Sequence, residues 1–390
     1  MNRNKTIFAL SLLAFLMAIV VVVLGAYTRL ADAGLGCPDW PTCYGHLWVP
    51  TTEGDIARAN ENFADTPVET HKTWPEQIHR IFASSLGLVI LGIFIIAFRN
   101  RAAGKACNIT VVLLLSLVGA TVARIVFGSV MDVLLLLLAM LYFACLFRQY
   151  INQGYSPNAY KLISLLAGLV ILQGWFGMWT VTLKLWPQVV TAHLLGGFTL
   201  LSLLWLLVQR SGGYGWELPE DQVLRVKKLI RLAVFAFFVV AIQIALGGWT
   251  SSNYAALACP DFPTCHGSWW PGGDFRQGFN LLQHVGPNYL GGQLDNHART
   301  AIHLAHRVGA IMVFFSVSIL VIQLLRVQSN TVRKWAFITL GVLCLQIALG
   351  VTNVMEGLPL MVAVAHNAVG AGLLLCVVTL IHRIYGAKSI

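Results

Sequence analysis

Four histidines, His79, His193, His306 and His366, lie inside long apolar segments of the sequence. Ionisable side chains are expensive within a membrane span and usually mark a functional site. One such histidine alone could simply bond a neighbouring helix, but these four form two pairs at equivalent places in an internal repeat. Two imidazoles that face each other across a helical bundle are typical axial ligands of haem iron, whereas zinc would need further ligands that are not evident at that depth. We predict one haem pocket from His79 and His193 and another from His306 and His366.

A carboxylate precedes the first of these histidines by three residues. Residues at i and i+3 share a helix face, so Glu76 is expected to point toward the same pocket as His79. There it could take a proton or orient a water molecule. The alternative is a helix-start residue, because an acid in the first turn favours the helix dipole. We favour the functional role because the matching position before His306 holds His303, which shares a face with His306 and could replace it as a ligand.

Two identical C-x5-C motifs pair Cys37 with Cys43 in CPDWPTC and Cys259 with Cys265 in CPDFPTC. Thiols on the outer side of a membrane are in an oxidising environment, so two disulfide bonds are expected. Each would close a loop of about seven residues, which is worth roughly 2 kcal/mol in the chain-entropy model. A metal site built from all four thiolates is the alternative, although this spacing is not the short spacing of zinc sites.

Two basic residues near the outer ends of first-half spans have no basic counterpart in the second half. Arg29 corresponds to Ser251, and Lys184 corresponds to Gly357. Each cation could bind a haem propionate. The alternative is that these long side chains only extend toward the membrane surface.

The chain repeats itself. The segment LGAYTRLADAGLGCPDWPTCYG returns as LGGWTSSNYAALACPDFPTCHG, 222 residues later, and EQIHR and VILQGWFGMWTV match HLAHR and VLCLQIALGVTNV. Repeat-related pairs include Gly25/Gly247, Cys37/Cys259, Asp39/Asp261, His79/His306, Gln173/Gln346, Gly177/Gly350 and His193/His366. Each unit has an even number of helices, so we predict two tandem four-helix bundles related by a pseudo-twofold axis along the membrane normal.

Membrane helices must position these residues. Of the 390 residues, 57% are hydrophobic and only 11% are charged, and the mean hydropathy is +0.73. A soluble domain has about 25% charged residues, so this composition excludes a soluble enzyme, a disordered protein and a nucleic-acid-binding domain. Apolar spans long enough to cross a bilayer as helices are predicted near 6–27, 76–98, 107–124, 130–147, 161–182, 188–209, 232–251, 298–325, 335–355 and 361–382.

The net charge of +10 describes topology rather than an acidic partner. Basic residues collect in short loops on one side of the predicted bundle, for example Arg99, Arg101 and Lys105 after the second span. Such residues mark the cytoplasmic side, which places both termini in the cytoplasm. The long loops at about 28–75 and 252–297 then face outward, and the four histidines lie near the outward ends of their helices.

The histidine spacing shows an insertion in the first repeat. His79 and His193 are 114 residues apart, against 60 for His306 and His366, and the difference of 54 fits one helical hairpin at about 105–148. We assign it a structural or partner-facing role. The prediction is therefore an all-α polytopic membrane protein with about ten transmembrane helices. It comprises an N-terminal repeat at 1–210, a cytoplasmic linker at 211–231 and a C-terminal repeat at 232–390.

These residues together resemble the haem A synthase family. The resemblance rests on GAYTRLADAGLGCPDWPTCYG, PEQIHR, GMWTVTLKLWPQVVTAHLLGG, HLAHRVG and VAHNAVGAG, and it covers nearly the whole chain except the hairpin. It implies two fused four-helix bundles in a bacterial inner (plasma) membrane, with the haem sites toward the periplasmic side. The hairpin departs from the family, because it gives ten helices where the family has eight.

The resemblance implies an oxidoreductase that converts haem O to haem A for haem–copper cytochrome oxidases. The C8 methyl group would become a formyl group in two successive two-electron oxidations, with water as the expected oxygen source. By this resemblance haem b falls on His306 and His366, the substrate haem O falls on His79 and His193, and the catalytic glutamate falls on Glu76. A haem O synthase is the implied supplier, and the electron acceptor is unidentified.

A second function class fits the same histidines. Two structural haems would make the chain a diheme b-type membrane electron carrier or a haem-handling transporter. Chromatography of the extracted haems separates these classes, because a carrier would hold haem b alone. The chain is expected to act in the lipid bilayer, where it could assemble as a homo-oligomer, and no nucleic-acid partner is expected.

Overall fold

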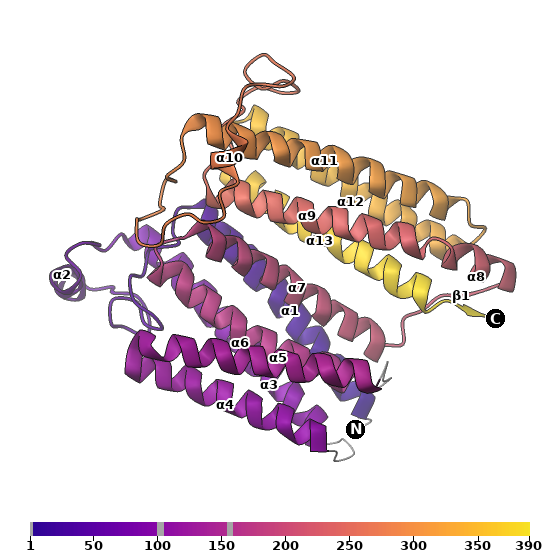
Figure 1. The fold of residues 1–390 in the computed structure, drawn as a ribbon, viewed down its shortest axis with the longest axis horizontal. Coiled ribbons are helices and arrows are strands. Elements are labelled where there is room, and N and C mark those ends of the chain that lie inside the picture. The colour runs from indigo at the N-terminus through magenta and orange to yellow at the C-terminus, as the bar shows by residue number, and fades with distance from the viewer. Residues whose placement is uncertain (1–2, 100–104, 154–158) are drawn as a thin grey trace. The chain divides into compact units, whose positions relative to one another are not determined.

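The computed structural model describes residues 3–99, 105–153 and 159–390, and this part of the chain is almost entirely helical (Figure 1). The long helices are α1 (Arg3–Leu30), α3 (Thr70–Arg99), α4 (Lys105–Phe127), α5 (Asp132–Gln153), α6 (Tyr160–Thr182), α7 (Pro187–Ser211), α9 (Ile230–Ser252), α11 (Asn296–Leu325), α12 (Asn330–Met355) and α13 (Leu360–Tyr385). The short elements are α2 (Glu53–Asn62), the 3-10 helix η1 (Gly128–Met131), α8 (Glu220–Lys227), α10 (Phe275–Gly278) and the strands β1 (Glu217–Leu218) and β2 (Lys388–Ser389). The predicted all-α class is confirmed.

Membrane-length helices dominate the described residues. Nine are long and apolar enough to cross a bilayer, and α4 adds a shorter apolar stretch, Ile109–Arg124, at the span predicted near 107–124. Large apolar side chains such as Leu88 and Ile242 are exposed, as expected where the surrounding solvent is lipid. Of the basic residues predicted to mark the cytoplasmic side, Arg101 and the side chain of Lys105 lie outside the described residues.

The chain divides into two compact units. Unit 1 comprises Met1–Ala18, Ile81–Trp175 and Thr199–Gly213, and unit 2 comprises Ile19–Arg80, Phe176–Phe198 and Tyr214–Ile390. These units cut across the repeats, because unit 2 holds both outer loops as well as the second repeat. The repeat-based limits at 1–210, 211–231 and 232–390 therefore stay a prediction.

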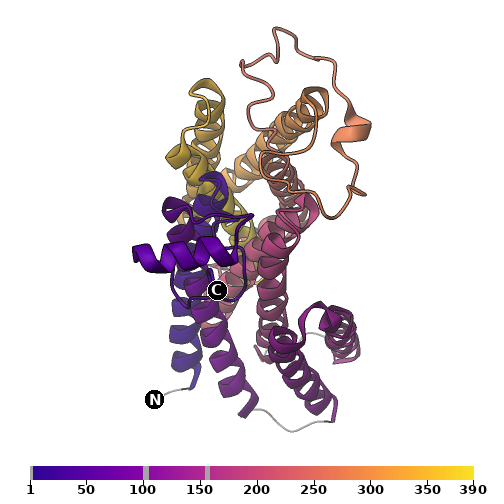
Figure 2. The same ribbon diagram turned by 90° about the vertical axis from the view of Figure 1, so that its left-hand side faces the viewer.

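Unit 1 contains the hairpin inserted into the first repeat. Helices α4 and α5 pack against each other, and η1 connects them (Figure 2). Arg124 Nε pairs with Asp132 Oδ1 at 3.0 Å across this turn. Trp175 Nε1 on α6 donates to Thr121 Oγ1 on α4 at 2.9 Å. The insertion is thus tied to a helix of the first repeat.

Unit 2 contains the four-helix bundle of the second repeat. Helix α9 packs against α11 and α13, and α12 packs against the same two helices (Figure 1). Its core is aliphatic, with fully buried side chains such as Val317, Leu320, Val332 and Leu380. Strands β1 and β2 pair in parallel, with Glu217 opposite Lys388, so the C-terminus is attached to the linker that precedes the bundle.

Repeat-equivalent residues contact each other within unit 2. Arg29 Nη2 donates to Ser251 O at 2.5 Å, and Tyr254 OH donates to Asp32 Oδ1 at 3.0 Å, and both pairs are separated by 222 residues. Residues that meet their own counterparts lie at a twofold axis. These contacts agree with the pseudo-twofold relation that the repeat predicts, and that relation stays a prediction.

Candidate functional site

The four histidines lie on four helices, and all four belong to unit 2. His79 is on α3, His193 on α7, His306 on α11 and His366 on α13. His193 lies within electrostatic range of His79, and His306 lies within range of His366. Their pairing and their role as haem ligands stay predictions, with which this electrostatic proximity agrees.

Each histidine packs against a glycine of the neighbouring helix. The distance from a Cβ built on the glycine to the imidazole Cε1 is 2.9 Å for Gly25 and His79, 3.5 Å for Gly177 and His193, 3.2 Å for Gly247 and His306, and 3.0 Å for Gly350 and His366. Three of these distances are tighter than most real Cβ contacts, so the imidazole can approach the helix only because the side chain is absent. The sequence marks these glycines as repeat pairs, but their partners become visible only in the fold.

We expect Gly350→Ala to weaken haem retention by about fivefold or more. The new methyl group would lie 3.0 Å from His366 Cε1, and overpacking of this kind costs about 1–3 kcal/mol. The matched control is Gly341→Ala on the same helix, where a Cβ meets nothing within 4 Å. The measurement is haem absorbance per purified protein, and equal haem content in the two variants would contradict the expectation.

The donor set fits a haem better than a bare metal ion. Nδ1 of His193 is buried, with no hydrogen-bond partner among the described residues. Buried polar atoms without partners are rare, and they call for a ligand or another explanation. Within the described part of the chain, no group of three or more His, Cys, Asp or Glu side chains could hold a metal ion directly. Paired imidazoles suit an iron whose other ligands come from a macrocycle.

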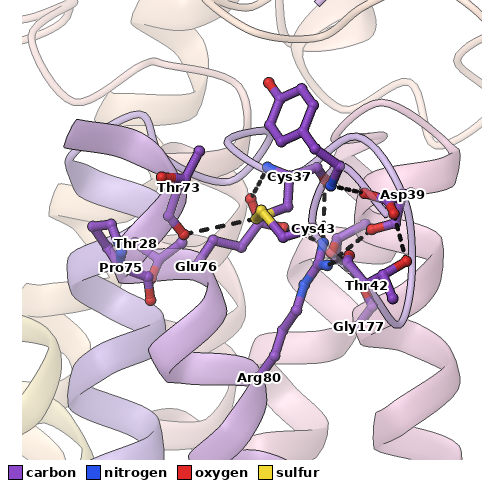
Figure 3. Close-up of polar contacts among 12 residues, drawn as sticks. Thr28, Cys37, Asp39, Thr42, Cys43, Thr73, Pro75, Glu76, Arg80 and Gly177 are labelled. Atoms are coloured by element: carbon purple, nitrogen blue, oxygen red, sulfur yellow. Dashed lines mark hydrogen bonds and ion pairs between the residues drawn. A yellow bond between two sulfur atoms is a disulfide. The ribbon is translucent and has the colours of Figure 1, made fainter. Parts of the chain in front are cut away.

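Glu76 is buried, with 4% of its surface exposed, and both of its carboxylate oxygens are bonded (Figure 3). The backbone amide of Cys37 donates to Oε2 at 2.9 Å, and Arg80 Nη2 donates to Oε1 at 2.5 Å. Charge-assisted bonds of this kind fix orientation as well as adding energy. The carboxylate is therefore held between the helix of His79 and the first disulfide loop.

The placement of Glu76 in a first helical turn is wrong. Helix α3 begins at Thr70, and Pro75 lies inside it. Proline removes only the bond to the carbonyl four residues earlier, here that of His71 near the helix start, so the helix continues through it. The helix-start alternative for Glu76 is thereby removed, because a carboxylate beyond the first turn gains little from the dipole.

Both predicted cysteine pairs are disulfide-bonded. Cys37 is joined to Cys43 and Cys259 to Cys265, and Cys37, Cys43 and Cys259 are fully buried. All four sulfur atoms are consumed, so the alternative of a four-thiolate metal site is wrong.

An arginine clamps each disulfide loop, and each arginine directly follows a predicted ligand, His79 or His306. The bonds are Arg80 Nη1 to Asp39 O (2.8 Å) and Thr42 O (2.7 Å), Arg80 Nη2 to Cys37 O (3.2 Å), Arg307 Nη1 to Thr264 O (2.7 Å), and Arg307 Nη2 to Cys259 O (2.9 Å) and Asp261 O (2.8 Å). In the sequence these arginines serve only to align EQIHR with HLAHR. Their recurrence directly after both predicted ligands is the signal from which their bonds to the disulfide loops could have been predicted.

An aspartate supports each loop from within. Asp261 accepts hydrogen bonds from the Thr264 hydroxyl at 2.6 Å and from the amides of His266 at 2.6 Å and Gly267 at 3.0 Å. These bonds, that of Thr264 foremost, hold the pKa of the Asp261 carboxyl well below its usual range. Asp39 accepts the same three kinds of bond in the first loop.

Tyr44 anchors the end of the first loop. Its side chain is buried next to Cys43, and its hydroxyl donates to Thr66 O at 3.0 Å and Pro67 O at 3.2 Å. Burial above all, together with the charges of Glu69, Glu76 and Asp39, raises the pKa of Tyr44 to about 12.

We expect this phenol to make the first loop sensitive to alkaline pH. A raised folded-state pKa means that folding favours neutral Tyr44, so its contribution is fully present below pH ~10 and is lost as the pH rises toward ~12. The rate of Cys37–Cys43 reduction by a phosphine should therefore rise across this window. Tyr44→Phe should flatten that rise, whereas Tyr385→Phe, at an exposed tyrosine, should keep it. A rise of the same size in Tyr44→Phe would refute the assignment.

The side chain of Arg29, one of the two predicted propionate contacts, makes other bonds. In addition to its bond to Ser251 O, Arg29 Nη1 donates to Tyr254 OH at 2.9 Å. The guanidinium carbon of Arg29 also lies 4.2 Å from the centre of the Tyr254 ring. The backbone carbonyl of Lys184 accepts from the amide of Tyr289 at 3.0 Å. Binding of a propionate by Arg29 or Lys184 stays a prediction.

His303 is buried at the position that matches Glu76. Its Nδ1 lies 3.0 Å from Ala255 O, so it faces the loop of its own repeat as Glu76 faces Cys37. His306, not His303, has the contact with Gly247 that repeats the contact between Gly25 and His79. This geometry favours His306 as the ligand.

Known proteins resemble this chain along its whole length. Residues 8–131 and 124–378 match the model of the COX15-CtaA family, described as cytochrome oxidase assembly protein, and the two matches overlap at the inserted hairpin. The Heme A synthase of Shewanella oneidensis is 37% identical over 378 residues, which cover 97% of this chain and 96% of that protein. The Heme A synthases of Rhizorhabdus wittichii and Halalkalibacterium halodurans are 25% and 24% identical, covering 93% and 94% of this chain and 89% and 92% of their own lengths.

The two ranges that match the family model together span both repeats, and the relatives align over nearly their full lengths. The chain belongs to the COX15-CtaA family of cytochrome oxidase assembly proteins.

Proposed function

We propose that this chain is a membrane enzyme that forms haem A by oxidising the C8 methyl group of haem O to a formyl group, with water as the oxygen source. The full-length similarity to proteins named Heme A synthase supports it. One observation carries the proposal further. The two repeats have matching histidine pairs and matching disulfide loops, but only the first repeat places a buried carboxylate, Glu76, between its ligand helix and its loop.

From this difference we infer different tasks for the two sites. His79 and His193 would hold the substrate haem O in the repeat that carries Glu76. His306 and His366 would hold haem b in the repeat that carries His303 instead. Haem b, when bound, would supply a route for electrons toward an acceptor outside the chain.

The residues around Glu76 would handle protons at the substrate site. Removing hydrogen from a methyl group in two-electron steps releases protons, and a carboxylate within reach can accept and pass them on. Arg80 and the amide of Cys37 keep the two oxygens of Glu76 in place, so the group needs no rearrangement before it acts.

The proposed setting is a bacterial inner membrane, with both termini in the cytoplasm and the disulfide loops on the periplasmic side. The buried disulfides agree with an oxidising compartment. A haem O synthase would supply the substrate, and assembly into a homo-oligomer is compatible with this topology.

The test is the identity of the haems in the purified full-length protein, by extraction and chromatography. Haem b together with haem O, haem A or a hydroxylated intermediate is expected. Haem b alone, in cells that also make haem O, would instead identify a diheme electron carrier or a haem-handling transporter. Absence of haem from a folded preparation would refute both assignments.

A further inference from the structure

Gln243 on α9 contacts the ring of His306. Its Nε2 lies 3.1 Å from His306 Nδ1 and donates to His306 O at 3.0 Å. Its Oε1 is buried and has no hydrogen-bond partner among the described residues. The amide therefore touches the predicted haem ligand on one side and has an unused acceptor on the other.

Gly309, one turn after His306, makes room for this amide. A Cβ at Gly309 would lie 2.1 Å from Gln243 Oε1 and 3.0 Å from Leu246 Cδ1, too close for any side chain without displacing the glutamine. Gln243 and Gly309 also line an apolar groove of about 260 Å³ between α9 and α11. An apolar side chain at position 243 can therefore extend into this groove without a clash.

The other ligand of the second repeat has a similar neighbour. Gln346 Nε2 on α12 lies 3.3 Å from His366 Nε2, and a Cβ at Gly370 would lie 3.2 Å from Gln346 Nε2. Both histidines of this repeat therefore have a glutamine from an adjacent helix beside them, but only Gln243 contacts Nδ1, the ring nitrogen that faces away from an iron bound at Nε2.

The first repeat lacks this arrangement at His79. Val21 occupies the position 222 residues before Gln243, and Phe82 follows His79 by three residues as Gly309 follows His306. Gln173 does match Gln346. The amide next to the α11 ligand is therefore a difference between the repeats, in addition to Glu76 and His303.

We propose that Gln243 is a positioning residue for His306, which orients the ring and lowers the reduction potential of the haem in the second repeat. This inference rests on the proposed function, in which His306 and His366 hold haem b. A histidine that coordinates iron through Nε2 carries its proton on Nδ1, and an acceptor on that proton raises the basicity of the ligand. If the Gln243 amide turns over, so that its nitrogen and oxygen exchange positions, Oε1 faces His306 Nδ1 and can accept its proton. A more basic ligand stabilises oxidised iron and makes the potential more negative.

The backbone permits this exchange. The exchange gives up the Gln243 bond to His306 O, but that carbonyl lies inside α11 and keeps the hydrogen bond of the helix itself. The exchange is favoured when His306 Nδ1 carries a proton, because Oε1 can accept that proton and Nε2 cannot. Gly309 leaves the space into which the nitrogen would turn.

The experiment is a redox titration of the full-length protein, with the haem b signal identified by its loss in His306→Ala. Gln243→Leu removes the amide, and Gly309→Ala keeps the amide but displaces it. Both variants should shift the potential of this haem to a more positive value and change its low-spin electron paramagnetic resonance signal. Val21→Gln, which places an amide near His79, should leave the potential of this haem unchanged.

The outcomes separate the two claims. No haem b in the wild-type protein, or a haem b signal that survives His306→Ala, means that the proposed function fails at this site. Haem b present, with unchanged potentials in both Gln243→Leu and Gly309→Ala, means that Gln243 does not tune His306. A shift of equal size in Val21→Gln also overturns the inference. If Gln243→Leu fails to fold, Gly309→Ala alone decides.

Discussion

His366→Ala is expected to lower the haem b content of the purified protein by at least about 100-fold. The variant removes one of the two predicted axial ligands of the second repeat, and even loss of an outer contact to a metal ligand costs about 10–100-fold in affinity. The matched control is His382→Ala, another histidine of the same helix, whose Nε2 lies 3.1 Å from Tyr214 O at the far end of α13. Haem b per protein, from the extracted pigment, is the measurement.

Helix α11 offers a second control for this prediction. His306→Ala should lose haem b as His366→Ala does, whereas His303→Ala should retain it, because His303 bonds the loop carbonyl of Ala255. Haem b retained in His366→Ala, or lost only in His303→Ala, would contradict the ligand assignment.

The helices and the histidine pairs were open to prediction because each depends on one-dimensional patterns. Continuous apolar runs must form helices in lipid, where the backbone has no other way to satisfy its polar groups. His79 lies in such a run, and His306 lies at the matching place in the other repeat, 227 residues later. This recurrence can be seen in the sequence without knowing how the helices pack. The disulfides follow from identical spacing in both outer loops.

The supporting contacts could not be predicted, because they depend on the register between segments far apart in the chain. Arg80 reaches three carbonyls that lie 38 to 43 residues earlier, and Gln243 reaches a ring 63 residues later. Helix periodicity says which face a residue occupies but not which residue of the neighbour lies opposite. The helix-start alternative for Glu76 is wrong for a different reason, because helix α3 begins at Thr70, six residues before the glutamate.

Glu76→Gln is expected to reduce haem A formation by about 10²–10⁴-fold while leaving haem b in place. Glutamine nearly matches glutamate in shape and can still accept from the Cys37 amide, but it cannot take up a proton at neutral pH. The measurement is the ratio of haem A to haem b extracted from cells that supply haem O. Glu61→Gln, at an exposed glutamate of the same outer loop, is the control and should keep the wild-type ratio. An unchanged ratio in Glu76→Gln would exclude proton handling by this group.

Arg80→Gln distinguishes a chemical role of Glu76 from a structural one. This variant removes the ion pair with Glu76 and the bonds to the loop carbonyls, but it keeps the carboxylate. If Glu76 only held the loop, Arg80→Gln would lower haem A formation as much as Glu76→Gln and would also expose the Cys37–Cys43 disulfide to reductant. If Glu76 handles protons, Glu76→Gln should lose far more activity with its disulfide still protected, because loss of a proton-transfer group acts on the reaction and not on the stability of the loop.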